Sequence, residues 1–357
     1  MAVTPETTPT TTPDAIRAFR AEHADMRPRD QADRLGISEA QLVAASCEDG
    51  ATRIAAHPDT VMAAAQELGE VMALTRNDSF VHEKIGAYDN YHPGEHAAMI
   101  LTEQIDLRIF PAHWCHAFMV EAPGGAVPRR SLQVFDAAGD TVHKVILRDA
   151  SAHAAWDGLR DRLAGDNQRP EQAVAARTPP EPPKPRPDKV EILRAEWRRM
   201  TDTHQFLRMS AKLKMNRLGA YRVAGAPFAW PLAPGAADTL LARLAESDIA
   251  VMVFVGNRGC IQIHSGPIDR LTPIGPWQNV MDPDFNLHLR RDHVAELWAV
   301  EKPTRAGPTT SVEAFDAAGG LICQVFGLRK EARDCRAAFA GLVADLPTRD
   351  SAAAVVS

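Results

Sequence analysis

The chain has 357 residues, of which 45% are hydrophobic and 24% are charged. This composition excludes wholesale disorder, and the length suits two domains better than one. The formal charge of −6, from 40 Lys and Arg against 46 Asp and Glu, disfavours nucleic acid as a partner. Since no run of 18 apolar residues occurs, we expect no helix inserted in a membrane.

Cysteine usage favours a reducing compartment. The chain has five cysteines, an odd number, and no CxxC pair joins any two of them. Neither a disulfide framework nor a structural zinc site is therefore expected. The N-terminal stretch MAVTPETTPTTTPD also lacks the basic segment and apolar core of a secretory signal. We expect a cytoplasmic protein.

Helical patterns open the chain. Residues 1–13 are rich in Thr and Pro and are predicted to form a disordered tail. Apolar residues then recur at helical spacing in 14–27, 37–46 and 58–68. This periodicity predicts three helices ahead of the first strands.

Residues 29–46, RDQADRLGISEAQLVAAS, have the pattern of a helix-turn-helix. Gly36 ends a short helix and Ser38 caps the next. DNA-binding repressors place the second helix of this motif in the major groove. Here that helix carries no Arg or Lys. We therefore expect a helical corner packed on a sheet rather than a DNA-binding surface.

Alternating apolar and polar residues predict antiparallel strands. RRSLQVFDAAGDTVHKVIL (129–147) is typical of a hairpin that turns at DAAGD. DIAVMVFVGNRGCIQIHSG (248–266) is a second hairpin, which turns at GNRG. The segments IDLRIF and FNLHLR are predicted to be short strands.

A proline-rich connector divides the chain. TPPEPPKPRPD, residues 178–188, has six prolines and favours a stiff, extended segment. Helical patterns follow in 189–213 and 235–247. The order of helices and then antiparallel strands, twice, predicts an α+β fold. We divide the chain into a first repeat at 14–177, the connector, a second repeat at 189–346, and a C-terminal tail at 347–357.

An internal repeat relates the two halves at an offset of 180 residues. FDAAG at 135–139 recurs at 315–319, and Val71-Met72 recurs as Val251-Met252. Further matches follow in the same frame, without a gap, over more than 60 residues. Agreement sustained in one frame over this length indicates a duplication.

Histidines are the candidate metal ligands. His82 stands alone in a predicted strand, where a structural role is the usual one. His113 and His116 could share one face of a helix and hold a metal, or be separated at a strand end, and no third ligand is evident. His204 lies on or beside the apolar stripe of the 189–213 helix. Such a histidine is either a satisfied core residue or a haem ligand in an apolar slot.

Three cationic residues are relevant to the hypothesis that His204 is a haem ligand. Arg217, Lys302 and Arg329 come from distant segments, and each is individually typical of a solvated surface charge. Haem carries two propionates, which Arg and Lys pair with. The three residues are therefore candidates for holding the propionates if the fold brings them together.

The chain resembles the bacterial cytoplasmic haem-utilisation proteins called hemin-degrading factors or hemin transport proteins, of the HemS/HmuS type. The resemblance covers roughly residues 14–346. Its strongest stretches are RDQADRLGISEAQLVAA, LGEVMALTRNDSFVHEKIG, IDLRIF, MTDTHQF, VMVFVGNRGCIQIHSGP, GPWQNVMDPDFNLHLR and SVEAFDAAGGLICQVFGLR. It implies a duplicated α+β protein with two large antiparallel sheets stacked at its centre and one haem in a cleft between the halves.

The resemblance also implies roles for single residues. His204, in MTDTHQF, would be the proximal iron ligand, and Arg108, in IDLRIF, would face the distal side through water. Phe110 and Phe254 would line the apolar walls. The positions that match the family's propionate contacts are Arg217, Lys302, Gln324 and Arg329.

Three positions qualify this picture. The family often has a tyrosine where this chain has Phe326, so we expect a lost hydroxyl contact but a retained stacking surface. Between the repeats, Gln262 replaces His82 and His288 replaces Arg108, so only one copy of each pair need be functional. His82 is retained as a candidate for a secondary or transfer haem site.

These inferences predict a haem-binding protein of iron acquisition that opens the porphyrin oxidatively and releases the iron. Arg108 and its water would order the distal side. Since no GxGxxG motif occurs, we expect an external electron donor. The alternative is a haem chaperone that carries imported haem from an inner-membrane importer to a separate haem oxygenase. A helix-turn-helix regulator is a third, disfavoured hypothesis.

Overall fold

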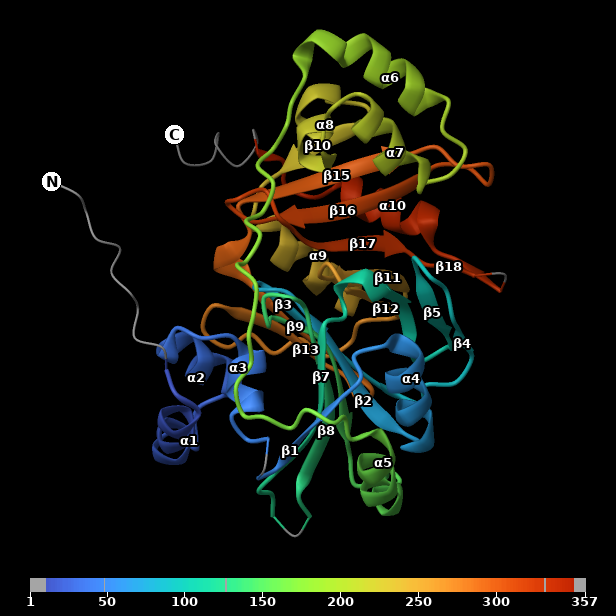
Figure 1. Cartoon of the computed structure of the whole chain (residues 1–357). Coiled ribbons are helices and arrows are strands. Elements are labelled where there is room, and N and C mark those ends of the chain that lie inside the picture. Colours follow the sequence, from blue (N-terminus) through green and yellow to red (C-terminus); the bar gives the residue numbers. More distant parts are fainter. Residues whose placement is uncertain (1–10, 48, 126, 331, 350–357) are drawn as a thin grey trace, which may run out of the picture.

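Two large antiparallel sheets form the centre of the molecule (Figure 1). The computed structural model describes residues 11–47, 49–125, 127–330 and 332–349. The tails predicted at 1–13 and 347–357 therefore lie largely outside the described residues. Across the described ranges, one sheet has eight strands and the other nine. We call them sheet A and sheet B.

The strands of both sheets follow an order that crosses between the repeats. Sheet A has the order β1 (Ala51–Ile54), β7 (His116–Ala122), β8 (Arg129–Phe135), β9 (Thr141–Leu147), β2 (Val71–Arg76), β3 (Phe80–Gly86), β14 (Phe285–Arg290) and β13 (Trp277–Met281). Sheet B has the order β10 (Ala229–Leu232), β15 (Glu296–Lys302), β16 (Thr309–Phe315), β17 (Leu321–Gly327), β11 (Val251–Gly256), β12 (Cys260–Gly266), β6 (Asp106–Ile109), β5 (Ala98–Leu101) and β4 (Tyr91–His92). A short ribbon pairs β18 (Arg329–Lys330) with β19 (Arg333–Asp334).

The two repeats exchange strands. β14 of the second repeat pairs with β3 of the first, and β6 of the first pairs with β12 of the second. Each sheet is therefore completed by the other repeat. The repeats are units of sequence, whereas each sheet is a joint product of both.

Helices flank the sheets in two groups. The first repeat contributes α1 (Pro13–Glu22), α2 (Pro28–Leu35), α3 (Glu39–Ala44), α4 (Pro58–Glu67) and α5 (Trp156–Leu163). The second contributes α6 (Val190–Arg198), α7 (Gln205–Lys212), α8 (Arg217–Ala224), α9 (Ala236–Ala245) and α10 (Arg336–Ala344). Four short 3-10 turns lie at η1 (Pro111–His113), η2 (His153–Ala155), η3 (Pro187–Lys189) and η4 (Arg291–His293). No helix in the described ranges is long and apolar enough to span a membrane.

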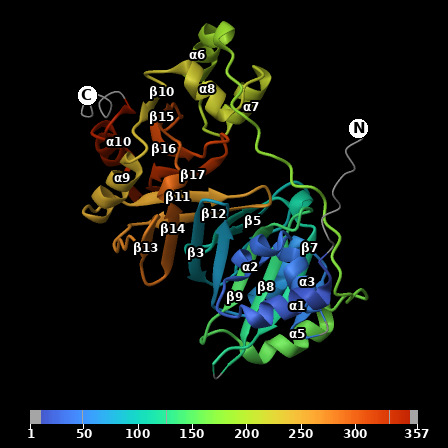
Figure 2. The ribbon, with the colours of Figure 1, turned by 90° about the vertical axis from the view of Figure 1, so that its left-hand side faces the viewer.

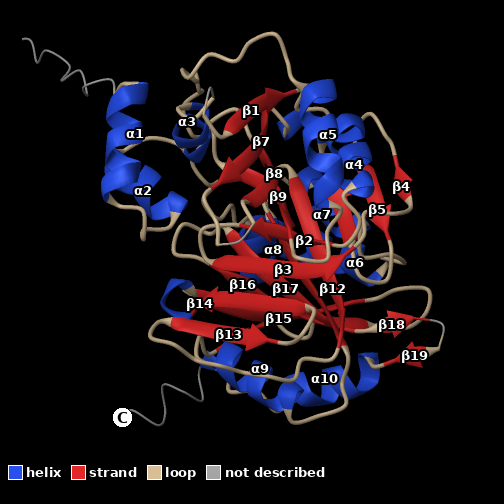
Figure 3. Cartoon of the chain, turned by 90° about the horizontal axis from the view of Figure 1, so that it is seen from below, coloured by secondary structure: helices blue, strands red, loops and turns tan. Residues whose placement is uncertain are grey.

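Each sheet has an inner and an outer face. On the inner faces, α4 and α5 pack on sheet A together with β5 and β6, and α9 and α10 pack on sheet B together with β13 and β14. Figure 3 shows α9 and α10 together on one flank. The outer face of sheet B is covered at one end by α6, α7 and α8, which stand above β15 and β16 in Figure 1. The outer face of sheet A bears α3 at the corresponding end.

The structure confirms the predicted α+β class, the duplication and the hairpins. Strands β2, β3, β7, β8 and β9 begin 180 residues before β11, β12, β15, β16 and β17. The predicted helical corner is also present, since Gly36 is left-handed after α2 and Ser38 forms a capping box on α3. The helix predicted over 189–213 is wrong. It is two helices, α6 and α7, and the separate helix α8 was not predicted at all.

Candidate functional site

A row of five residues crosses the outer face of sheet B. Residues directly opposite each other in paired strands project to the same face. The register aligns Glu313 with Gln324, Gln324 with Phe254, Phe254 with Ile263, and Ile263 with Asp106. At about 4.8 Å per strand, the two ends of this row lie roughly 19 Å apart. The row joins a polar cluster at β16 to the exchanged strand β6.

Predicted residues flank this row on the same face. Arg108 follows Asp106 by two residues, so both side chains project outward, and they form an ion pair. Phe110 follows at the end of β6 and is half-buried. The Phe254 and Phe326 rings meet edge to face at 5.3 Å and are both half-buried. Three aromatic rings and one arginine thus lie on this face, beyond the end that α6, α7 and α8 cover.

A buried ionic cluster closes the end of this face beneath α8. Glu313 accepts from Lys302 Nζ at 2.8 Å and from Arg217 Nη1 at 2.9 Å. Tyr221 and Ser311 also donate hydroxyl hydrogen bonds to Glu313, at 2.8 and 2.9 Å. The structure therefore brings the predicted pair Arg217 and Lys302 together around a carboxylate that sequence reasoning missed.

The charges and the burial of this cluster shift the pKa values of its members. Burial alone would raise the pKa of Glu313, but the Lys302 ammonium and the Arg217 guanidinium hold it well below its usual value. Burial, with the charge of Glu313, raises the pKa of Tyr221 well above its usual value. Two cations and one carboxylate leave a surplus of one positive charge. An anionic group of a ligand would complete the neutralisation.

Helices α6, α7 and α8 form an aromatic cap over the cluster. Phe206 of α7 packs edge to face on Trp197 of α6, with ring centroids 4.7 Å apart, and lies 5.3 Å from Tyr221 of α8. The Lys302 ammonium lies 5.1 Å from the centroid of the Phe206 ring. This contact fixes α7 against the cationic end of the face.

His204 stands at the start of α7, two residues before Phe206. It is the N-cap residue of α7 rather than part of an apolar stripe, which corrects the prediction of a mid-helix position. Its side chain is 94% exposed. The helix breaks here because Asp202 accepts a hydrogen bond from the His204 backbone N–H at 2.8 Å, a local contact that competes with helix formation.

Asp202 also orients the His204 imidazole. Asp202 Oδ1 lies 2.7 Å from His204 Nδ1, and these hydrogen bonds lower the pKa of Asp202. A carboxylate at Nδ1 selects the tautomer that leaves Nε2 unprotonated, as metal-ligating histidines require. Nε2 makes no hydrogen bond to any described residue. His204 is thus prepared to bind a metal ion supplied by a ligand.

Gln324 and Arg329 occupy different places. Gln324 is half-buried in the row between Glu313 and Phe254. Arg329 is exposed in the β18–β19 ribbon, two residues after the end of β17. The end of β17 and Lys302, the last residue of β15, lie at the same edge of sheet B. Two strand spacings put this point roughly 10 Å from Lys302. Arg329 is therefore near the cationic end but outside the cluster.

The structure separates His82 from this face. His82 is fully buried on the inner face of sheet A, and both its ring nitrogens lack a hydrogen-bond partner among the described residues. Burial lowers its pKa well below the usual value. A haem at His82 would require the two sheets to part, so its position gives no support to the candidate secondary site and favours the structural role.

The outer face of sheet A has a related cluster with a different composition. Glu39 of α3 pairs with Arg76 on β2 and Lys144 on β9, whose repeat-related positions are Gly256 and Gln324 rather than the members of the Glu313 cluster. The N-cap of α2 is Arg27 rather than histidine. His288, at the repeat position of Arg108, is held by Asn279 at 2.7 Å. The first repeat therefore has an ionic cluster at a different place, and its α2 lacks the histidine that begins α7.

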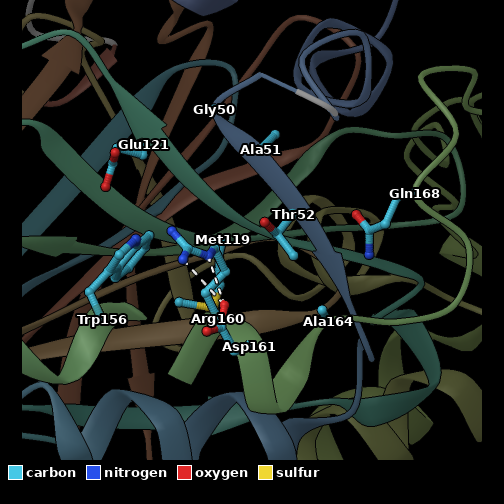
Figure 4. Close-up of a pocket in the computed structure, with 10 residues that line it drawn as sticks. All are labelled: Gly50, Ala51, Thr52, Met119, Glu121, Trp156, Arg160, Asp161, Ala164 and Gln168. Carbon is cyan, nitrogen blue, oxygen red and sulfur yellow. Dashed lines mark hydrogen bonds and ion pairs between the residues drawn. The ribbon is translucent and has the colours of Figure 1, made fainter. Parts of the chain in front are cut away.

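Other candidates do not form a site. His113 ends η1 and His116 begins β7, where Gln172 contacts its Nδ1 at 3.1 Å. Among the described residues, no group of three His, Cys, Asp or Glu could hold a metal ion. A pocket of about 370 Å³ between β1, β7 and α5 is lined by Trp156, Glu121 and Arg160 (Figure 4). It belongs to the first repeat and lies apart from His204.

Comparison with known proteins identifies the family to which this chain is similar. The family model described as the haemin-degrading HemS.ChuX domain matches residues 36–163 and 214–346. The hemin transport protein HmuS of Yersinia pestis is 35% identical over 335 residues, which are 94% of this chain and 96% of that protein. The hemin transport protein HemS of Yersinia enterocolitica is 36% identical with the same coverage.

Solved structures match over the same extent. Holo-PhuS, a heme-binding protein from Pseudomonas aeruginosa, has a TM-score of 0.89 at 37% identity, and the match covers 94% of this chain and 99% of that one. ChuS, described as an E. coli heme oxygenase, has a TM-score of 0.82 at 31% identity, and the match covers 93% and 99% of the two chains.

Proposed function

We propose that this chain, which belongs to the HemS.ChuX family of haemin-degrading domains, binds one haem on the outer face of sheet B and degrades it. The observation that carries the proposal is the position of His204 above this face. Its Nε2 is exposed, its Nδ1 is held by Asp202, and its helix is anchored on the cation cluster through Phe206.

The residues of the face match the parts of a haem. The porphyrin is large and mostly apolar, and the half-buried rings of Phe254 and Phe326 offer it a surface. Arg217 and Lys302, with their surplus positive charge, would pair with a propionate. His204 would supply the axial nitrogen. We retain Gln324 beside the cluster, Arg329 at the sheet edge and Phe110 beside Arg108 as further contacts.

Arg108 is the residue that we assign to the degradation step. Bound haem supplies the iron chemistry, and the protein supplies orientation and electrostatics. Arg108 lies at the far end of the row from the Glu313 cluster, paired with Asp106. A guanidinium there would hold a water molecule and favour negative charge on the side of the ring opposite His204. An external donor must provide the electrons.

Haem delivery is the second candidate function, and one observation favours it. The His204 side chain is 94% exposed, so a receiving protein could approach the iron ligand directly. A haem importer would then load the protein, and a separate haem oxygenase would receive the cargo. Cys115, Cys260, Cys323 and Cys335 are thiols outside any disulfide, which suits the cytoplasmic location that both functions require.

The deciding experiment is anaerobic haem reconstitution followed by reductant and oxygen, with catalase present. The Soret band is followed, and the products are identified by mass spectrometry. Loss of the band with an open tetrapyrrole and released iron establishes degradation. An intact band that moves only when an apo-oxygenase is added establishes delivery. A wild-type protein that binds no haem contradicts both.

A further inference from the structure

The connector and the three residues that lead into it, 175–177, form one segment that docks on the repeated FDAAG turn in the first half. The backbone N–H of Ala175 donates to the carbonyl of Ala137 at 2.7 Å. The Arg177 guanidinium then donates hydrogen bonds to both carboxylate oxygens of Asp140, at distances of 2.7 to 3.0 Å. In Figures 1 and 2 the connector runs as a yellow-green trace from the α5 end of the molecule up to α6.

The connector meets the equivalent turn in the second half. An added Cβ at Gly319 would lie 2.8 Å from the Pro183 ring, so the two are in close contact. Gly139 and Gly319 both have positive φ, 80° and 88°. The strongest sequence identity between the repeats therefore forms two similar turns, and both contact the same connecting segment.

Beyond this turn, the connector is bonded to the first turn of α8 through Asn216. The Asn216 amide accepts from the Lys184 backbone N–H at 2.9 Å and donates to the Pro182 carbonyl at 2.8 Å. The same amide oxygen caps α8 by accepting from the Gly219 N–H at 3.0 Å. One side chain thus ties the connector to the helix that begins at Arg217.

Gly219 lets the connector lie directly on α8. A Cβ at this position would stand 2.3 Å from the Lys184 carbonyl oxygen and 2.4 Å from its carbon. Both are backbone atoms, so a side chain here must displace the connector. Gly219 is on the same turn as Arg217, whose guanidinium is held 2.9 Å from Glu313.

We infer that the connector is a strap that holds α8 and its Arg217 in place for the ligand carboxylate, with Asn216 and Gly219 as positioning residues. This inference rests on the proposed haem site. The strap is fixed at the FDAAG turn of each repeat and at the α8 cap. Displacing it would misplace the guanidinium but leave the Asp202–His204 hydrogen bond and the Phe254–Phe326 contact, which involve neither α8 nor the connector.

The test is a double-mutant cycle on haem affinity. Gly219→Ala should weaken haem binding roughly tenfold, about the value of one charge-assisted hydrogen bond. In an Arg217→Gln background it should cause no further loss, because the strap acts through Arg217. Gly158→Ala is the matched control. Gly158 is also the third residue of its helix, α5, and an added Cβ there meets no atom within 4 Å.

Asn216→Ser provides a second variant that folds readily. Serine caps a helix as well as asparagine does, but its side chain is shorter and lacks the amide N–H that donates to the Pro182 carbonyl. It should weaken haem binding in the wild-type background and not in Arg217→Gln. Equal losses in both backgrounds would show general destabilisation and overturn the inference, as would unchanged affinity. If the wild-type protein binds no haem, the proposed function fails first and the inference falls with it.

Discussion

His204 Nδ1 lies 2.7 Å from Oδ1 of Asp202, two residues earlier in the turn between α6 and α7. The same carboxylate holds the His204 backbone N–H. Asp202 thus lies at the break between α6 and α7 and sets the tautomer of the His204 imidazole. A ligand that binds Nε2 would find an imidazole already oriented.

His204→Ala should abolish the Soret signature of histidine-bound haem, because the axial nitrogen is lost. Asp202→Ala should keep the signature and weaken haem affinity by roughly tenfold, the usual effect of removing a partner of a metal ligand. Haem titration followed by absorption measures both. His57→Ala is the control, since His57 is also an exposed helix N-cap with an aspartate two residues away. An unchanged spectrum in His204→Ala would rule out this residue as the ligand.

Glu313→Gln should destabilise the empty protein more than the haem-loaded protein. Removing the carboxylate leaves Lys302 and Arg217 buried without a counter-charge, which costs roughly 3 kcal/mol of unfolding free energy. A propionate would replace part of that counter-charge, so the loss should be smaller with haem bound. Urea unfolding of both forms gives the comparison.

The control for this change is Glu39→Gln in the first repeat. Glu39 is buried between Arg76 and Lys144. Its replacement should destabilise both forms equally, because no ligand carboxylate reaches this cluster. If haem reduces the loss no more in Glu313→Gln than in Glu39→Gln, the second-repeat cluster does not bind the propionates.

Arg108→Ala should retain haem and slow its degradation by roughly 100-fold. Positioned cations and hydrogen-bond donors contribute about this much when charge develops near them. Single-turnover decay of the Soret band under reductant and oxygen measures the rate. His288→Ala alters the repeat-related position on sheet A and should leave the rate unchanged. Equal rates in Arg108→Ala and wild type would remove Arg108 from the mechanism.

Buried histidines should make the fold sensitive to mild acid. Burial lowers the pKa of His143 and His264 to about 3 and that of His82 well below its usual 6.5. As the pH falls below 6.5, the unfolded chain binds these protons before the folded protein does. The free energy of unfolding therefore decreases as the pH falls. Each group contributes a loss of roughly 2 kcal/mol by pH 5. The depressed pKa values of Glu39 and Glu313 lower stability only in more acidic solution.

Urea unfolding at pH 7.5, 6.5 and 5.5 measures this slope. His143→Gln should flatten it, because a glutamine does not titrate and can still bond to Thr75 and Tyr88, which contact the His143 ring at 2.8 and 2.6 Å. A slope identical to that of the wild-type protein in this variant would exclude His143 as a source.

Local pattern was sufficient for much of the fold. The strands of the 129–147 and 248–266 hairpins were predicted because alternation and turn residues lie within a few positions of each other. The helix break before His204 was missed, although MTDTHQF has the signal. Asp202 lies two residues before the histidine and next to β-branched threonines, a composition typical of a turn.

The amino-acid order alone was enough for the duplication and the α+β class, since each depends on periodicity or on a repeated short motif. Only the folded chain shows that β6 and β14 exchange sheets, and that Glu313 sits between Arg217 and Lys302. Strand exchange and the Arg217–Glu313 ion pair join residues about 90 to 200 positions apart. Their partners are chosen by packing and burial across the whole molecule, which no local window of sequence contains.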